Sequence, residues 1–135
     1  MRVTKIRVLT LSAVVLGSLV IAVPLASAKS YKVSLKQIGH FNGTTITGTI
    51  SGKPLGKGTL KGKVNFSTNA SVQTWKLKGG TIKVSGVVKL TTGTLGVGPW
   101  KVLKGTGKYK GVKGGGVTNG DVATGKFTWK GKLVY

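Results

Sequence analysis

The chain has 135 residues, with 22 basic residues against a single acid, Asp121, and it contains one histidine, His40, and no cysteine. A single carboxylate excludes the two-carboxylate mechanism of most glycosidases. The composition also supplies neither a carboxylate cage for Ca²⁺ nor a Cys/His set for Zn²⁺, and it excludes disulfides.

Residues 1–28 have the layout of a signal peptide. A short basic segment precedes a mostly apolar run over residues 8–23, and Ala26 and Ala28 supply the small residues that a cleavage site needs. The apolar run is shorter than the ~20 residues of a membrane span. We therefore expect cleavage at Ala28-Lys29 and a secreted, extracellular product.

The remaining segment, residues 29–135, is long enough for one domain with its own core and too short for two ordinary ones. Three of the 22 basic residues fall in the signal peptide, so 19 remain, and all of them are lysine. With one acid, the domain has a net charge of about +18.

Apolar and polar side chains alternate with a period of two along almost the whole domain, which is typical of half-buried strands. Two-residue hairpin loops are predicted where residues that tolerate positive φ interrupt the alternation, at Asn42-Gly43, Gly79-Gly80 and Asn119-Gly120. Eight strands follow, at about residues 31–41, 44–51, 57–67, 71–78, 81–90, 99–104, 108–118 and 121–135.

Four glycines fall at inward-facing positions inside these strands: Gly48, Gly62, Gly86 and Gly131. Repeated inward glycines are what a small closed barrel uses to turn its corners. Eight strands enclose an interior that side chains just fill, or that holds one small ligand. The predicted fold is therefore an all-β, antiparallel, eight-stranded up-and-down barrel, with a two-sheet β-sandwich as the alternative.

Each of the three tryptophans is followed by a lysine. Such pairs form either an aromatic and cationic surface strip or a row of inward tryptophans and outward lysines, and the strand alternation favours the second arrangement. We expect the following aromatic residues to form the core or to line a cavity: Phe66, Trp75, Trp100, Phe127, Trp129 and Tyr135.

The segment from Lys104 to Gly114 reads K-G-T-G-K-Y-K-G-V-K-G. It resembles the G-G-T-G-x-[FY]-x-x-[AV]-x-G turn of the dirigent and allene oxide cyclase-like barrels, with Lys104 in place of the first glycine. The resemblance implies an antiparallel barrel with a cavity, often assembled as a homo-oligomer. It implies no catalytic residue here, because dirigent-like sites use acidic and arginine residues, and residues 29–135 contain no arginine and one aspartate.

The sequence presents no catalytic constellation. His40 is predicted at the end of the first strand, where a lone histidine is usually solvated. Asp121 directly follows a predicted turn and fits turn chemistry. No nucleophile elbow places a serine near both residues. We therefore favour a non-enzymatic protein without a cofactor or metal.

The lysines are the strongest functional signal. A surface with so few acids attracts polyanions such as teichoic acid, acidic polysaccharide or extracellular DNA, and it also suits an anionic membrane surface. Lysine is a hydrated point charge, so we expect delocalised binding without base or sugar readout. The densest predicted polyanion-binding cluster is Lys104, Lys108, Lys110 and Lys113.

Two alternatives remain at this stage. In the first, a dirigent-like or cyclase-like barrel binds a small apolar ligand in its cavity, and the charge is incidental. In the second, the chain is an outer-membrane barrel with its apolar side chains facing lipid and its lysines facing the lumen. The positions of the tryptophans and lysines distinguish these alternatives.

Overall fold

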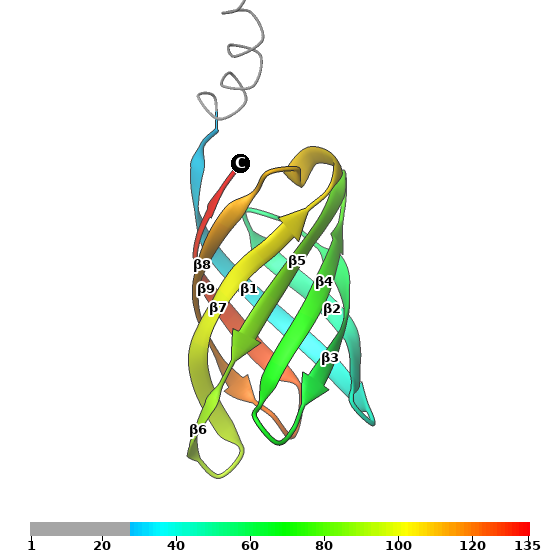
Figure 1. The fold of residues 1–135 in the computed structure, drawn as a ribbon, viewed down its shortest axis with the longest axis vertical. Helices are drawn as coiled ribbons and strands as arrows, with labels where there is room; N and C mark the ends of the chain where they lie inside the picture. The colour runs from blue at the N-terminus through cyan, green and yellow to red at the C-terminus, as the bar shows by residue number, and fades with distance from the viewer. Residues whose placement is uncertain (1–27) are drawn as a thin grey trace, which may run out of the picture.

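The computed structural model describes residues 28–135, so the predicted signal peptide lies outside the described residues except for Ala28. These residues form a barrel of β-strands with a single short 3₁₀ turn, η1 (Figure 1). The elements are β1 (Ser30–Asn42), β2 (Thr45–Lys53), β3 (Gly58–Asn65), β4 (Ala70–Leu77), β5 (Gly80–Val87), β6 (Lys89–Thr92), β7 (Leu95–Gly105), η1 (Gly107–Tyr109), β8 (Lys113–Asp121) and β9 (Lys126–Val134).

Except for β5 and β6, the strands pair antiparallel with their neighbours in the chain, and two further pairings close the sheet. β1 pairs with β9, and β5 pairs with β7. Eight strands thus form a closed barrel, while β6 prolongs β5 beyond the barrel end and pairs with β7 (Figure 1). The predicted up-and-down barrel is confirmed, and closure excludes the two-sheet sandwich. No helix of the described chain is long and apolar enough to cross a membrane.

The prediction of a hairpin loop at Asn119-Gly120 is wrong. Both residues lie inside β8, where Gly120 pairs with Phe127 of β9. The turn comes later because the side chain of Asp121 accepts a hydrogen bond from the backbone N–H of Ala123 at 2.8 Å, which stabilises a turn that ends at Gly125 with φ of 76°. Gly120 instead allows β9 to pack closely against β8, since a Cβ there would collide with the backbone of β9.

Two other strand boundaries were also predicted wrongly. The predicted connection over residues 91–98 is mostly strand, because the hairpin turns tightly at Gly93, with φ of 57°, and β7 begins at Leu95. The strand predicted from residue 108 begins at Lys113, because η1 and a second left-handed glycine, Gly111, precede it.

The barrel interior is filled at mid-height by three tryptophans. The rings of Trp75, Trp100 and Trp129 lie within 5.3–5.8 Å of one another, in tilted and edge-on arrangements. All three are at most 3 % exposed. Aromatic pairs in these geometries add to the large apolar area that each ring buries. Aliphatic side chains of the other strands, with Leu35 and Ile82 among them, complete this core.

Several inward glycines allow neighbouring strands to approach closely. A Cβ at Gly48 would collide with the carbonyl oxygen of Ile38 on β1, and one at Gly131 would collide with the carbonyl oxygen of Gly115 on β8. Gly131 also adopts φ of 154°, which a residue with a side chain rarely does. These glycines bend the strands around the tryptophan core, as barrel corners require.

Candidate functional sites

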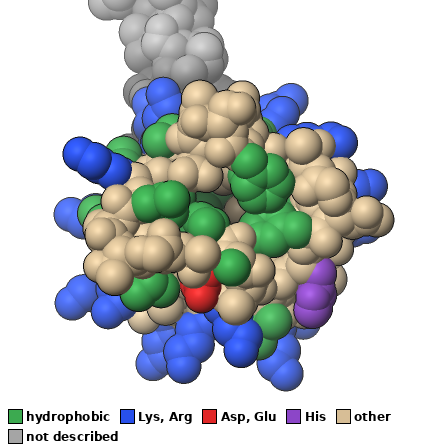
Figure 2. All heavy atoms as spheres, turned by 90° about the horizontal axis from the view of Figure 1, so that it is seen from below, with side chains coloured by type: hydrophobic (Ala, Val, Ile, Leu, Met, Phe, Trp, Pro, Cys, Tyr) green, Lys and Arg blue, Asp and Glu red, His purple; other side chains and the backbone are tan. Residues whose placement is uncertain are grey.

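The outer wall of the barrel presents the lysines. In β1, for example, Val33 and Leu35 are buried, whereas Lys32 and Lys36 on either side of them are exposed. The view into one end shows lysines around the whole perimeter, with the single acid and the histidine at the edge (Figure 2). Lysines outside and tryptophans inside are the reverse of what the outer-membrane alternative requires.

Two lysine pairs lie directly opposite each other on neighbouring strands. Lys32 of β1 is paired with Lys132 of β9, and Lys83 of β5 is paired with Lys104 of β7. Directly opposite residues have Cβ atoms about 4.5–5.5 Å apart, and like charges at such positions destabilise a sheet. Asp121, the only acidic residue of the chain, lies on β8 and is part of neither pair.

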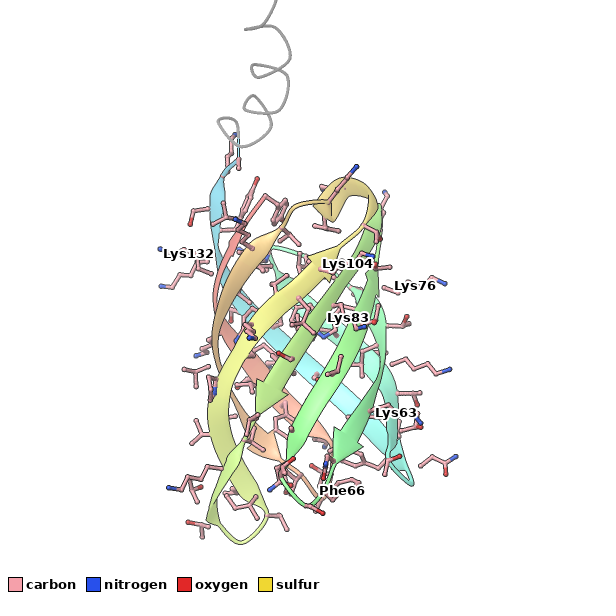
Figure 3. The ribbon with its side chains drawn as sticks, viewed as in Figure 1. Lys63, Phe66, Lys76, Lys83, Lys104 and Lys132 are labelled. Carbon is pink, nitrogen blue, oxygen red and sulfur yellow. The ribbon has the colours of Figure 1, made fainter. Side chains whose placement is uncertain are left out.

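The second pair depends on an irregularity in β7. Val84 pairs with Val102 and Lys83 with Lys104, so Leu103 is an extra residue without an opposite partner. This bulge reverses the alternation of β7 and places Lys104 on the outside. Lys76, Lys83 and Lys104 consequently lie on the same wall of the barrel (Figure 3).

The register extends this pair into a row across four strands. Lys61 of β3 is opposite Thr74 of β4, which is opposite Lys83 of β5, which is opposite Lys104 of β7. We call Lys61, Lys83 and Lys104 the lysine row. With about 4.8 Å between strands, the backbone positions of its lysines are spaced at roughly 10 Å and 5 Å along the barrel wall.

The four lysines predicted as a polyanion-binding cluster are all exposed, and they lie around the turn that closes one barrel end. Lys104 and Lys113 line one surface hollow. The Nζ of Lys108 lies 5.8 Å from the centre of the Tyr109 ring, and Lys110 follows η1. Among them, Lys104 alone belongs to the lysine row.

This closing turn is anchored to the neighbouring turn between β4 and β5. The backbone N–H of Lys108 donates to the carbonyl of Gly79 at 2.8 Å, and the hydroxyl oxygens of Thr81 and Thr106 are 2.7 Å apart. Tyr109 points inward and is 2 % exposed. The segment that resembles the dirigent turn is therefore part of the packed barrel end.

The opposite end, which we call the mouth, is formed by the β1–β2, β3–β4 and β8–β9 turns, and it contains an apolar hollow (Figure 2). Phe41, Phe66, Phe127 and Trp129 are among the side chains that line this hollow, and its accessible volume is about 30 Å³. Such a volume accommodates about two water molecules. It is far below the ~300 Å³ or more of a drug-sized ligand site.

The remaining predicted aromatic residues lie at the two ends. Phe66 is 47 % exposed at the mouth, where its ring meets that of Phe41 edge-on at 5.3 Å. Phe127 is partly buried against the core near the mouth, and Tyr135 is partly buried at the far end. Tyr135 stacks on Tyr31 with ring centres 4.5 Å apart.

His40 and Asp121 do not form a catalytic pair. His40 is exposed on the outer wall opposite Thr47 of β2. Asp121 is engaged in its turn, where hydrogen bonds from the Thr94 side chain and the Ala123 backbone lower the pKa of its carboxyl group. Residues 28–135 contain no cluster of three or more His, Cys, Asp or Glu residues that would hold a metal ion.

The sequence analysis did not predict which lysines face each other on neighbouring strands. It also did not identify the buried glutamines Gln37 and Gln73. Pairing of the first and last strands, which any closed barrel requires, would have indicated the Lys32–Lys132 pair. No signal in the sequence indicates the bulge at Leu103. No protein-family model, curated protein or solved structure matches this chain.

Proposed function

We propose that residues 29–135 form a secreted, non-enzymatic barrel that binds anionic polymers of a cell envelope or extracellular matrix through its lysine-covered wall. Teichoic acid, acidic polysaccharide and extracellular DNA share the required chemistry, which is a chain of closely spaced negative charges. The opposed pair Lys83–Lys104 is the observation that best supports this proposal.

Opposed lysines reduce the stability of the free protein, because each pair brings two positive charges together without an acid between them. A bound polyanion removes this penalty, since each phosphate or carboxylate neutralises charges that the fold itself leaves unpaired. The lysine row adds a matching geometry: a polymer lying across β3, β4, β5 and β7 would meet Lys61, Lys83 and Lys104 in succession.

The choice of lysine over arginine supports broad recognition. An ammonium group attracts phosphate or carboxylate without the two-pronged geometry by which arginine reads a specific base or carboxylate. We therefore propose binding that depends on charge density and salt and depends little on sequence or sugar identity.

The test is the salt dependence of binding to duplex DNA, teichoic acid, acidic polysaccharide and anionic vesicles, measured with the purified protein. Each lysine that neutralises a phosphate releases condensed counterions, so log K should fall linearly with log salt. A footprint of 6–10 phosphates would lower the affinity by roughly 10³–10⁵ between 50 and 200 mM salt.

Two variants and a control localise the surface. Lys83→Gln/Lys104→Gln should reduce the slope on duplex DNA by up to about two, and replacement of Lys104, Lys108, Lys110 and Lys113 by Gln by up to about four. Lys83→Arg/Lys104→Arg keeps both charges and should keep the slope. Absence of binding at low salt to every polyanion, or binding that salt does not change, would contradict the proposal.

A further inference from the structure

Two buried glutamines hold the indole N–H groups of two core tryptophans. Gln37 and Gln73 are 1 % and 4 % exposed. The Trp129 Nε1 donates to Gln37 Oε1 at 3.0 Å, and the Trp75 Nε1 donates to Gln73 Oε1 at 3.4 Å. Because an indole nitrogen only donates, these bonds fix which end of each amide is the oxygen and which is the NH₂ group.

The two amides differ at their NH₂ ends. Gln37 Nε2 donates to the carbonyl oxygen of Gly125 at 3.4 Å, which the β8–β9 turn brings over it. Gln73 Nε2 donates to no acceptor of residues 28–135, and the side chain lines the hollow at the mouth. A buried N–H group without a partner is costly, and native structures nearly always supply one.

Two glycines lie close to Gln73 or to the hollow that it lines. A Cβ at Gly62 would collide with the carbonyl oxygen of Val72 and would also lie 2.9 Å from Gln73 Cγ, so the glycine accommodates both the neighbouring strand and the glutamine. Gly86, on the wall of the same hollow, is different: a Cβ there would meet no atom nearer than 3.4 Å. A methyl group at Gly86 would therefore fit in ordinary contact with its neighbours, whereas one at Gly48 would collide with backbone.

We propose that the mouth binds a small neutral carbonyl compound, whose oxygen accepts a hydrogen bond from Gln73 Nε2 as the Gly125 carbonyl does from Gln37. Because the hollow has room for about two water molecules, the carbonyl group would enter it and the apolar body would lie at the entrance beside the exposed ring of Phe66. A bulky group next to the carbonyl would be excluded.

The chemistry of the site selects a neutral acceptor over an anion. A carboxylate that entered this apolar hollow would lose its hydration and find a single neutral amide donor at Gln73, which does not compensate the desolvation of a charge. A ketone, ester or amide oxygen needs no more than one such donor. The site uses no lysine, so it is independent of polyanion binding on the outer wall.

The test compares cyclopentanone with methylenecyclopentane, which has the same shape but a CH₂ group in place of the oxygen. Each is titrated into the ¹⁵N-labelled protein while the side-chain NH₂ resonances are followed by NMR. We expect cyclopentanone to shift the Gln73 NH₂ signals, to leave the Gln37 signals in place and to bind about tenfold more tightly than the hydrocarbon. Binding should be unchanged between 50 and 200 mM salt, which distinguishes it from polyanion binding.

Three variants make the outcome decisive. Gln73→Met should abolish the preference for the ketone, whereas the matched variant Gln37→Met, which also loses a tryptophan hydrogen bond, should retain it. Gly86→Ala keeps both glutamines and should weaken the binding of both compounds severalfold, because it adds a methyl group to the wall of the hollow. Equal affinity for ketone and hydrocarbon in the unmodified protein, no shift of the Gln73 signals, or a preference that survives Gln73→Met would overturn the proposal. In that case the hollow holds only water.

Discussion

Three tyrosines close the barrel end opposite the mouth. Tyr135 stacks on Tyr31, and its ring meets that of Tyr109 edge-on at 5.1 Å. Burial raises the pKa of the Tyr109 hydroxyl group. Burial also raises the pKa of Tyr135, and the neighbouring phenols Tyr109 and Tyr31 add to this effect, because two phenolates so close together would repel. The folded protein therefore retains these two protons to higher pH than the unfolded chain does.

This proton retention predicts a loss of stability at alkaline pH. The contribution is complete below the ordinary tyrosine pKa of about 10, and it is lost as the pH rises through the raised pKa values of the folded state. Alkaline pH also acts on stability through other groups of the protein. The unmodified protein is therefore compared with the variant Tyr109→Phe/Tyr135→Phe in urea titrations. The variant should lose less unfolding free energy between about pH 9 and pH 11 than the unmodified protein does.

Absorbance of tyrosinate provides the control for the same prediction. In the folded protein, the tyrosinate absorbance of Tyr109 and Tyr135 should appear later than in the unfolded chain, and in the double variant this late step should be absent. Equal losses of unfolding free energy in the two proteins would show that the raised pKa values do not influence stability.

The inward glycines of the strands are of two kinds, and this difference predicts opposite effects of the same substitution. Gly48→Ala would force a Cβ against the carbonyl oxygen of Ile38, so it should lower the unfolding free energy by about 1–3 kcal/mol. Gly86→Ala meets ordinary contacts and restricts the unfolded chain, so it should raise the unfolding free energy by about 0.4–1 kcal/mol. Chemical denaturation of both variants measures the difference, and equal effects would contradict the role given to Gly48.

The period-two alternation was enough to predict an all-β fold, because every strand of the closed barrel has one face in the core and one in water. The inward glycines and the number of strands favoured a barrel over a sandwich. The ends of the strands were less predictable. The dipeptide Asn119-Gly120 has hairpin character, yet the side-chain hydrogen bond of Asp121 moves the turn onward and Gly120 is needed where β9 comes close. The Asp121 turn is as local as the Asn119-Gly120 signal that it overrides. The close approach of β9 at Gly120 depends on strand pairing, which no dipeptide reveals.

The candidate sites, like the fold, could be predicted from the sequence only in part. Composition alone indicated a polyanion as the partner, and alternation placed the lysines outside. The opposition of Lys83 and Lys104 depends on the extra residue Leu103, which no periodicity reveals. The difference between the two glutamines depends on the turn at Gly125, whose carbonyl oxygen accepts a hydrogen bond from Gln37 Nε2. Gln73 Nε2 receives no such acceptor from residues 28–135. The relationship to dirigent-like barrels that residues 104–114 imply stays a prediction.

At the scale of the whole molecule, charge opposes the fold that the core stabilises. A domain with 19 lysines and one acid repels itself, and the buried tryptophans and aliphatic side chains supply the compensating stability. The repulsion is strongest where the sheet register sets two lysines side by side. A protein of this kind gains stability from anything that lowers the field around it, whether small ions or a bound polymer.

This balance predicts that dilute salt stabilises the protein. The screening length shortens from about 30 Å at 0.01 M to about 8 Å at 0.15 M, so the thermal midpoint should rise over this range of NaCl, below the concentrations at which salts act by exclusion from the surface. Removal of one opposed pair in Lys83→Gln/Lys104→Gln should raise the unfolding free energy by about 0.2–1 kcal/mol at low salt and by less at 0.15 M. Lys83→Arg/Lys104→Arg keeps the charges and should retain the full salt dependence. A midpoint that does not change with salt, or a Gln variant that is no more stable than the unmodified protein at low salt, would show that the opposed lysines do not strain the barrel, and the proposed polyanion function would lose its main structural support.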